Sequence, residues 1–477
     1  MKLLSPYVMW TSLVLMLFCC THTLAQFEEN YTPRNKYAHN STELIKTLEK
    51  QHKATRNSIE SSKKVRINNL YKKRTEALIR VVKNEGFIKD DTLNQVLYSV
   101  LENINRENNI NNSIKTILLS RSPDVNAYCV GEGTVILNVG LLARIENESQ
   151  LGFVLSHEMA HYELEHSKNR TLKYFESNQT KTAQSSFKSL LEGDINPEEA
   201  TELRDWVNNW GRYSRSSEIE ADSLGYLLFT ATNYHSDAPF EILNMLDSAL
   251  YPTRPLGDRL FQDLDFKNYP FKKKWLQRRL GIYSLKPSSL VFNDDSLLTH
   301  PDMHNRVAKL TNYHSESAGS ENIQSLDLMD LAIKMAQFET VESAFFSRRY
   351  DIGLHEALQL KSIYPANRYL TSVIGKILIN LYEHFDFFGI YVPKFTGEYS
   401  EELRMVNNFL HNLTKQELGE VVFHFLNNKQ NFNMMDEEHY YLLWKICDFT
   451  SKEEVKMKIQ ESYLAKFPGG KYNKQMK

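Results

Sequence analysis

Apolar residues recur at helical spacing in the amino-terminal part of the chain, from about residue 39 to residue 112. Most of this stretch is polar, and Gly86 interrupts it. Beyond the glycine, four apolar residues fall on one helical face: Leu93, Val96, Val100 and Ile104. We therefore expect a helical lead over residues 26–94, and we expect the second half of the pattern to pack on the core of the region that follows.

The carboxy-terminal part of the chain shows the same periodicity in a longer series of amphipathic segments. Helices are expected over residues 326–346, 353–364 and 366–382, and then to the end of the chain. The placement of Ala357, Leu358 and Tyr364 resembles that of tetratricopeptide repeats, which form solenoids. No clean repeat period is present, so residues 321–477 are expected to form either such a solenoid or a non-repeating helical cap.

A short segment in the middle of the chain alternates with the period of a strand. From residue 133 to residue 139 the two faces are Val135, Leu137 and Val139, and Thr134, Ile136 and Asn138. Apolar residues on both faces suit a largely buried strand. The expected fold class is therefore mainly α (α+β), with a small β-sheet among many helices.

The overall charge excludes one class of partner. The formal net charge is −2 and 24% of the residues are charged, so no basic field for a nucleic acid exists. Lys272, Lys273 and Lys274 form one local basic run beside Trp275. This run is either a solvated helix face or a point of peripheral contact with an anionic membrane surface.

The amino terminus has the pattern of a cleavable export signal. Lys2 precedes an apolar run over residues 7–18, and small residues around Ala25 offer a cleavage site. The run is too short to span a bilayer, so residues 1–25 are predicted to be removed and the mature chain to be soluble. Only Cys129 and Cys447 would remain, which does not suggest a disulfide scaffold. The expected location is the periplasm of a Gram-negative bacterium.

The clearest chemical motif is His-Glu-x-x-His over residues 157–161. On a helix, His157 and His161 differ by about 40° around the axis, so both imidazoles can bind one zinc ion. His166 points to roughly the opposite side and is a poor candidate for the same ion.

Glu158 lies beside the two histidines and is the candidate general base and acid. A zinc ion with three protein ligands lowers the pKa of a bound water to about 7, and Glu158 can accept its proton. The helix is expected to begin at an Asn147 cap with Gln150 three residues on. Neither glycine nor proline interrupts the run from residue 153 to Tyr174.

A second acidic segment, residues 214–225, offers the third ligand. It is predicted to be a helix with Ser217 as a possible cap, and Glu218 and Asp222 lie four residues apart on one face. This geometry favours Glu218 as the metal ligand and Asp222 as an acceptor that orients an imidazole N–H. Glu220 points about 200° away from Glu218 and is read as a solvated charge.

These motifs, in this order along the chain, resemble the CAAX-prenyl-protease-like gluzincin metallopeptidases, peptidase family M48. The resemblance covers roughly residues 95 to 312. It includes the 133–139 strand, the His-Glu-x-x-His helix, the segment from Glu218 to Asp222, and Thr299-His300-Pro301 followed by Arg306. It implies a zincin-like peptidase domain, which we place at residues 95–315.

The resemblance also implies roles for two residues that spacing alone does not assign. His300 is expected in the active site, where it hydrogen-bonds the tetrahedral intermediate or occupies the open zinc position in a resting state. Arg306 is expected to be a charge partner of Asp222 or of the intermediate. His304 matches no family motif and is read as exposed.

The function predicted from these observations is that of an exported zinc metalloendopeptidase with one Zn(II) per chain and polypeptide substrates. The 133–139 strand is either purely structural or an edge along which an extended peptide pairs. A chaperone or assembly factor, which binds outer-membrane clients through its helical domain with latent proteolysis, is the alternative. Envelope proteins, or a membrane surface, are the partners expected for peripheral contact. The sequence does not determine the oligomeric state.

Overall fold

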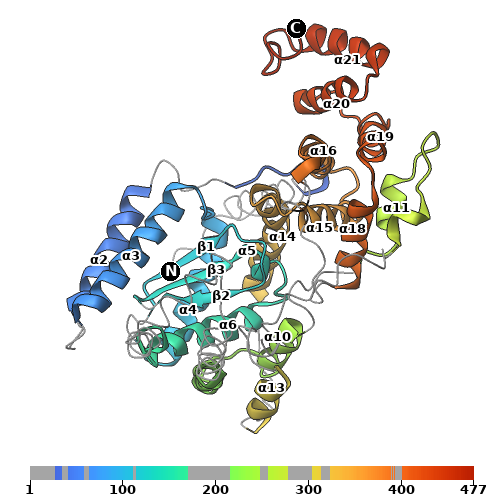
Figure 1. Ribbon diagram of the computed structural model, residues 1–477. Coiled ribbons are helices and arrows are strands. Elements are labelled where there is room, and N and C mark those ends of the chain that lie inside the picture. Colours follow the sequence, from blue (N-terminus) through green and yellow to red (C-terminus); the bar gives the residue numbers. More distant parts are fainter. Residues whose placement is uncertain are drawn as a thin grey trace, which may run out of the picture. The chain divides into compact units, whose positions relative to one another are not determined.

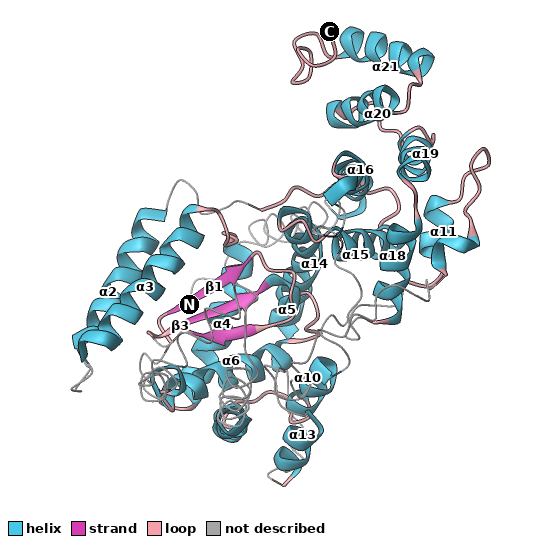
Figure 2. Ribbon diagram, in the orientation of Figure 1, coloured by secondary structure: helices cyan, strands magenta, loops and turns pink. Residues whose placement is uncertain are grey.

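The structure is a computed structural model. It describes residues 27–34, 41–57, 64–110, 114–130, 132–169, 215–247, 256–277, 303–312, 323–387, 389, 392 and 400–477. Within these ranges helices predominate and three strands form one sheet (Figures 1 and 2). The predicted mainly helical α+β class is therefore confirmed. The predicted signal segment, residues 1–25, lies outside the described residues.

The chain packs as two compact units. In the described ranges, the first unit comprises residues 34–247 and 303–336, and we call it the sheet unit. The second comprises residues 27–33, 256–277 and 337–477, and we call it the helical unit. The division differs from the expected domain boundaries, because residues 256–277 pack with the carboxy-terminal helices.

The sheet has the strand order β1-β3-β2, so β3 is its central strand. β1 (Thr116–Ser120) runs parallel to β3 (Thr134–Asn138), and β2 (Ala127–Cys129) runs antiparallel to it. Gly133 enters β3 with a φ of 73°, which a residue with a side chain rarely adopts. The idea that the 133–139 strand is an edge for peptide pairing is wrong, because β1 and β2 occupy both of its sides.

Two helices from the amino-terminal lead cover one face of this sheet. α2 (Ser41–Asn57) and α3 (Lys64–Lys83) contribute Leu48 and Val82, which pack against Leu118 of β1 and Ile136 of β3. On α2, the Gln51 side chain donates to Thr116 and accepts from Thr134, at the beginning of β1 and of β3. These polar contacts satisfy a buried amide inside an otherwise apolar layer.

Two further helices of the sheet unit pack against each other. α4 (Asp91–Glu107) follows the Asp90 cap and contacts α6 (Glu148–Glu163), which in turn contacts β2 (Figure 2). The four apolar residues that sequence analysis placed on one face are all buried in α4, as predicted: Leu93, Val96, Val100 and Ile104. The short α5 (Val139–Leu142) connects β3 to the α6 region.

The remaining described helices of the sheet unit lie around α6. A helix spans residues 215–230, and α10 (Ala238–Asp247) contacts both α6 and α13 (Met303–Thr311). α14 (Ile323–Phe346) includes the point at which the two units divide.

The described part of the helical unit is a succession of helices. The helices are α11 (Arg259–Leu264), η1 (Lys273–Leu276), α15 (Tyr350–Ile363), α16 (Arg368–Glu383), η2 (Phe385–Phe387), α18 (Glu401–Asn412), α19 (Lys415–Leu426), α20 (Glu437–Phe449) and α21 (Glu453–Lys466). The helices expected from sequence between residues 326 and 382 correspond to α14, α15 and α16. The expected tetratricopeptide pattern stays a prediction.

The lysine run of the sequence lies within the helical unit. Trp275 is fully buried, and Lys272 and Lys274 contact the carboxylate of Glu417 on α19 at 3.0 Å and 2.9 Å. The neighbouring tryptophan is therefore part of a core, and it does not lie on a surface that meets a membrane.

No helix within the described ranges is long and apolar enough to cross a membrane. Cys129 and Cys447 are free thiols.

Candidate metal centre

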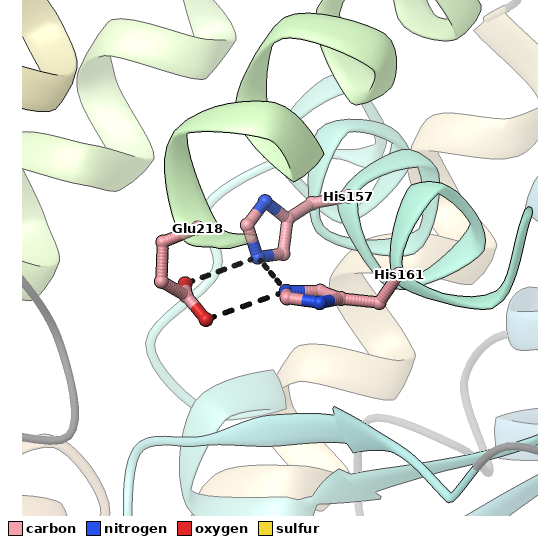
Figure 3. Close-up of side chains that lie close together, drawn as sticks. All are labelled: His157, His161 and Glu218. Carbon is pink, nitrogen blue, oxygen red and sulfur yellow. Dashed lines mark hydrogen bonds and ion pairs between the residues drawn. The ribbon is translucent and has the colours of Figure 1, made fainter. Parts of the chain in front are cut away.

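The two histidines of the motif project from α6 with their Nε2 atoms 3.0 Å apart. The helix begins at Asn147, whose side-chain oxygen accepts a hydrogen bond from the Gln150 backbone at 2.9 Å. This cap satisfies one of the unpaired amides of the first turn. The one-turn spacing then brings the two imidazoles to the same side of the helix (Figure 3).

Glu218 reaches the two imidazoles from the helix over residues 215–230. Its carboxylate oxygens lie 3.5 Å from His157 Nε2 and 3.4 Å from His161 Nε2 (Figure 3). One ligand atom from each of these three residues lies within 4.8 Å of the other two. All three side chains are largely buried, with 10–14% of their surface exposed.

Gly225 allows the two helices to approach closely. A Cβ atom at this position would lie 2.9 Å from the Cα of His157 and 3.0 Å from its backbone nitrogen. Contacts this short do not occur between real side chains and backbone, so only glycine fits here. The glycine faces the backbone of a ligand residue and thereby lets Glu218 reach across.

Asp222 lies one turn beyond Glu218 and contacts both His157 and Arg306. Its Oδ1 is 2.9 Å from His157 Nδ1, and its two oxygens accept hydrogen bonds from Arg306 Nε and Nη2, each at 2.6 Å. Burial favours the neutral acid, but the bonds from Arg306 and His157 outweigh it and lower the pKa of Asp222. Asp222 is therefore a carboxylate that faces the outer nitrogen of His157, and its role in orienting that imidazole stays a prediction.

The electrostatics of the three side chains fit a cation. Burial opposes protonation of His157, but Asp222 and Glu218 outweigh it and raise its pKa to about 10. Likewise, burial opposes the charged form of Glu218, but the two imidazoles hold its pKa well below the usual value. The carboxylates around the imidazoles therefore favour a cation, and a divalent metal ion would take the place of the protons.

The spacing of the donor atoms also fits zinc. Zinc bonds of about 2.0–2.1 Å at tetrahedral angles place ligand atoms about 3.3 Å apart. The separations between His157 Nε2, His161 Nε2 and the Glu218 oxygens are 3.0–3.5 Å. Two imidazole nitrogens and one carboxylate are also a ligand set typical of catalytic zinc.

Glu158 follows the first ligand in sequence and is itself buried. Burial raises the pKa of its carboxyl, while His161 and His157 and a hydrogen bond from the backbone of Cys129 act in the opposite direction. Glu158 thus lies between α6 and strand β2, outside the group of three ligand side chains. A carboxyl whose pKa is raised by burial is a stronger base than one in water.

His166 does not point away from the site, contrary to the sequence-based interpretation. α6 ends at Glu163 and does not continue to residue 174, and Glu165 adopts a φ of 51°. This turn brings the Nδ1 of His166 to 2.9 Å from the Nδ1 of His161. His166 still lies outside the group of three ligands.

Glu220 is also not merely solvated. Its Oε2 is 3.3 Å from His166 Nε2, and its Oε1 accepts a hydrogen bond from Ser216 at 3.0 Å. Its side chain is 58% exposed, so Glu220 is both solvated and in contact with His166. The contact between Glu220 and His166 could not be predicted from the sequence, because the left-handed turn is at Glu165 and not at the glycine that usually marks a helix end.

Of the other candidate residues, all but His300 lie within the described ranges. Ser217 is not a cap, because the helix already includes residue 215 and Ser217 is buried within it. Arg306 lies on α13 and is 3% exposed. His304 on the same helix is exposed, as expected. His300 lies outside the described residues.

Comparison with known proteins agrees with this geometry. Residues 89–314 match the model of Peptidase family M48. The chain is 25% identical over 187 residues to a putative beta-barrel assembly-enhancing protease of Vibrio cholerae, a match that covers 38% of each chain. It is 27% identical over 153 residues to the beta-barrel assembly-enhancing protease of Escherichia coli O157:H7, covering 30% of this chain and 31% of the relative. The matched part is thus well under half of each relative.

Proposed function

Because residues 89–314 belong to Peptidase family M48, we propose that the protein is a zinc-dependent metalloendopeptidase of the gluzincin type. The observation that supports this most is the convergence of His157, His161 and Glu218 from two helices on one point. These side chains would hold one Zn(II) per chain. All three side chains lie within the residues that match the family.

In this proposal the metal and the protein contribute different chemistry. A bound zinc ion with an open coordination position polarises the scissile carbonyl and lowers the pKa of a bound water to about 7. Glu158 accepts the proton of the attacking water and later donates it to the departing amine. Burial of Glu158 supports this role, because it raises the basicity of the carboxylate.

The outer side of β2 is the proposed position of the substrate backbone. Val130 donates to Thr134 at 2.9 Å and Asn138 donates to Asn126 at 3.0 Å. In an antiparallel pair the intervening residues, Ala127 and Cys129, then point their backbone groups away from β3. The Cys129 backbone N–H donates to Glu158, so a peptide extended along this side, paired with outward groups such as those of Ala127, would place a peptide bond near the general base.

Recognition through backbone pairing has a consequence for specificity. Hydrogen bonds to the peptide backbone give affinity with little dependence on side chains. Digestion of casein is therefore expected to give cleavage sites without one shared residue. A sharp preference at one position would instead require a side-chain pocket.

Two further assignments rest on the sequence, one on the family resemblance and one on the pattern of the amino terminus. His300 is proposed to hydrogen-bond the tetrahedral intermediate, or to occupy the open zinc position in a resting state. We also propose export to the periplasm after removal of residues 1–25. Amino-terminal sequencing of the protein from cells tests the second assignment, with Gln26 as the expected first residue.

The names of the two relatives support a proposal about substrates. Both are named for the enhancement of beta-barrel assembly as well as for proteolysis. We infer that the clients here are misfolded or envelope proteins, which the helical unit would bind. A second candidate function, favoured by the same names, is assembly assistance with latent proteolysis.

The substitution Glu158→Gln tests the enzymatic proposal. It keeps the shape of the side chain but removes the base, so we expect peptide cleavage to fall by about 10²- to 10⁴-fold while zinc content is unchanged. Glu163→Gln is the matched control, because Glu163 lies on the same helix, is exposed and loses the same charge. Full cleavage by the Glu158→Gln protein would overturn the mechanism.

The same variant separates the two candidate functions in cells. If proteolysis is the function, Glu158→Gln fails to complement a strain that lacks the protein. Complementation by this variant at normal abundance would favour assembly assistance instead.

A further inference from the structure

The segment that follows α6 folds back beneath one of the two metal-ligand histidines. Glu165 takes a left-handed φ of 51°, and residues 166–169 then form a single helical turn. The turn buries the side chain of His166, which is 3% exposed. Its ring meets the ring of His161 edge to face, with centroids 5.0 Å apart and an interplanar angle of 72°. His166 therefore occupies a fixed place behind His161.

Each ring nitrogen of His166 faces one polar partner. Nδ1 lies 2.9 Å from His161 Nδ1, and Nε2 lies 3.3 Å from the carboxylate of Glu220. Glu220 is itself held by Ser216, whose hydroxyl donates to the other carboxylate oxygen at 3.0 Å. Glu220 and Ser216 lie one turn apart on the helix that also includes Glu218.

These contacts determine where the hydrogen atoms lie. An ionised carboxylate only accepts, so the hydrogen of a neutral His166 lies on Nε2, toward Glu220. Nδ1 of His166 then has a lone pair and accepts. Between the two Nδ1 atoms the hydrogen therefore belongs to His161, and the Nε2 of His161 is left with a lone pair. That lone pair points at His157 Nε2 and Glu218, where the metal would bind.

We propose that His166 and Glu220 form a hydrogen-bonded relay that fixes the tautomer and orientation of His161 and thereby strengthens zinc binding. The inference rests on the proposed function, because it assigns positioning residues to the proposed zinc site. Neither residue belongs to the three side chains that would hold the metal. In order, the relay consists of Glu220 carboxylate, His166 imidazole and His161 imidazole.

The relay is separate from the contact that orients the other histidine. His157 Nδ1 faces Asp222, which is paired with Arg306, whereas His161 Nδ1 faces an imidazole. A metal-bound histidine needs an acceptor for its outer N–H, and loss of that acceptor costs about 10- to 100-fold in metal affinity. Each ligand thus has its own acceptor, and removal of one leaves the other in place.

The experiment compares two substitutions of His166 in the full chain. His166→Phe keeps a ring of similar size but removes both nitrogens. His166→Asn places an amide oxygen near the position of Nδ1, so it can still accept from His161. Zinc dissociation constants are measured by competition with a chromophoric chelator, and thermal unfolding is measured for the metal-free proteins.

The expected result is a graded loss of zinc affinity. His166→Phe should weaken zinc binding by about 10- to 100-fold, and His166→Asn should lie within a few-fold of the unsubstituted protein. A purely structural role predicts a different order, because asparagine fills the buried site less well than phenylalanine does. Equal losses in the two variants, or no loss in either, would overturn the relay.

Glu220 provides a second test at a position where folding is less sensitive, because its side chain is 58% exposed. Glu220→Ala removes the acceptor of His166 and should weaken zinc binding more than Glu163→Ala does. Glu163 is an exposed carboxylate near the end of α6 with no part in the relay. If the two alanine variants bind zinc with equal affinity, Glu220 is not part of the relay.

The outcomes also separate the relay from the proposed function. If the unsubstituted protein binds no zinc, the proposed function fails. If it binds zinc tightly and His166→Phe binds it equally tightly, only the relay fails.

Discussion

At the scale of single residues, Asp222 connects a buried arginine to one of the candidate metal ligands. Its carboxylate accepts two hydrogen bonds from Arg306 and faces the outer nitrogen of His157. Arg306 also comes within 3.6 Å of Glu218. A single buried carboxylate thus holds one ligand directly and compensates the charge of an arginine that touches another.

Asp222→Ala should therefore affect both stability and metal binding. Removal of the carboxylate leaves Arg306 buried without its main partner, a change that costs about 3–5 kcal/mol of folding free energy. His157 also loses its acceptor, so zinc affinity should fall by about 10- to 100-fold. Chemical denaturation and zinc competition measure the two effects.

Asp91→Ala is the control, because Asp91 is an exposed carboxylate in the first turn of α4. Asp91→Ala should leave the free energy of unfolding and the zinc affinity nearly unchanged. If Asp222→Ala leaves zinc affinity unchanged, Asp222 does not orient His157.

At the scale of elements, the site depends on the close approach of α6 and the helix over residues 215–230. Gly225 is the contact point, and it faces the backbone of His157 and Ser156. The ligands from the two helices meet because the backbones come this near. The separation of the helices therefore determines the geometry of the proposed site.

Gly225→Ala should lower the stability of the fold, whereas an ordinary glycine-to-alanine substitution within a helix raises it. Within a helix, alanine is normally more stable than glycine by about 1 kcal/mol. Here the new Cβ would lie 2.9 Å from the His157 Cα, and overpacking of this kind costs about 1–3 kcal/mol. We expect a lower melting temperature and weaker zinc binding.

Gly389→Ala is the matched control, since a Cβ at Gly389 meets nothing within 4 Å. It should not lower the melting temperature. A Gly225→Ala protein as stable as the unsubstituted chain, with the same zinc affinity, would show that close approach is not required.

The elements also show which features the sequence predicted. The His-Glu-x-x-His helix, its Asn147 cap and the 133–139 strand follow from local periodicity and cap chemistry, which are short-range properties. The end of α6 was predicted wrongly, because Glu165 adopts a left-handed conformation without glycine. The contact between His166 and His161 depends on that turn, so spacing alone could not reveal it.

The order of the strands in the sheet could not be predicted from the sequence either. The alternation over residues 134–138 identifies a buried strand but not its neighbours. β2 pairs with β3 across a short hairpin, but the parallel pairing of β1 with β3 passes over β2 in the sequence, and it is this longer-range pairing that makes β3 the central strand. The proposed peptide-binding side consequently belongs to β2.

At the scale of the whole molecule, residues 256–277 belong to the helical unit although they lie between segments of the sheet unit in sequence. Within the helical unit, Glu417 holds this segment to α19 through Lys272 and Lys274 and also accepts from the Thr414 backbone. Burial favours the neutral acid, but these partners outweigh it and lower the pKa of Glu417 to about 2.

The acid stability of the helical unit should therefore depend on Glu417. A carboxyl with a lowered folded-state pKa stabilises the fold above its unfolded-state pKa of about 4.3, and this stability is lost as the pH falls toward about 2. Glu417→Gln should lower the unfolding temperature at pH 6, and the difference should shrink steadily below about pH 4.3 and be mostly lost at about pH 2.

Glu454→Gln is the control for this prediction. Glu454 pairs with Lys458 on the surface of α21, where both side chains are strongly exposed, so its loss should have little effect. A constant difference between Glu417→Gln and the unsubstituted protein from pH 6 to pH 2.5 would contradict the assignment.

The central claim is that two helices supply three side chains to one zinc ion. X-ray diffraction data collected on both sides of the zinc absorption edge, from crystals of the full chain, test it most directly. We predict one anomalous peak per chain, within about 2.0–2.2 Å of His157 Nε2, His161 Nε2 and a carboxylate oxygen of Glu218. Absence of a peak at this position, or a peak bonded to the histidines without Glu218, would contradict the claim.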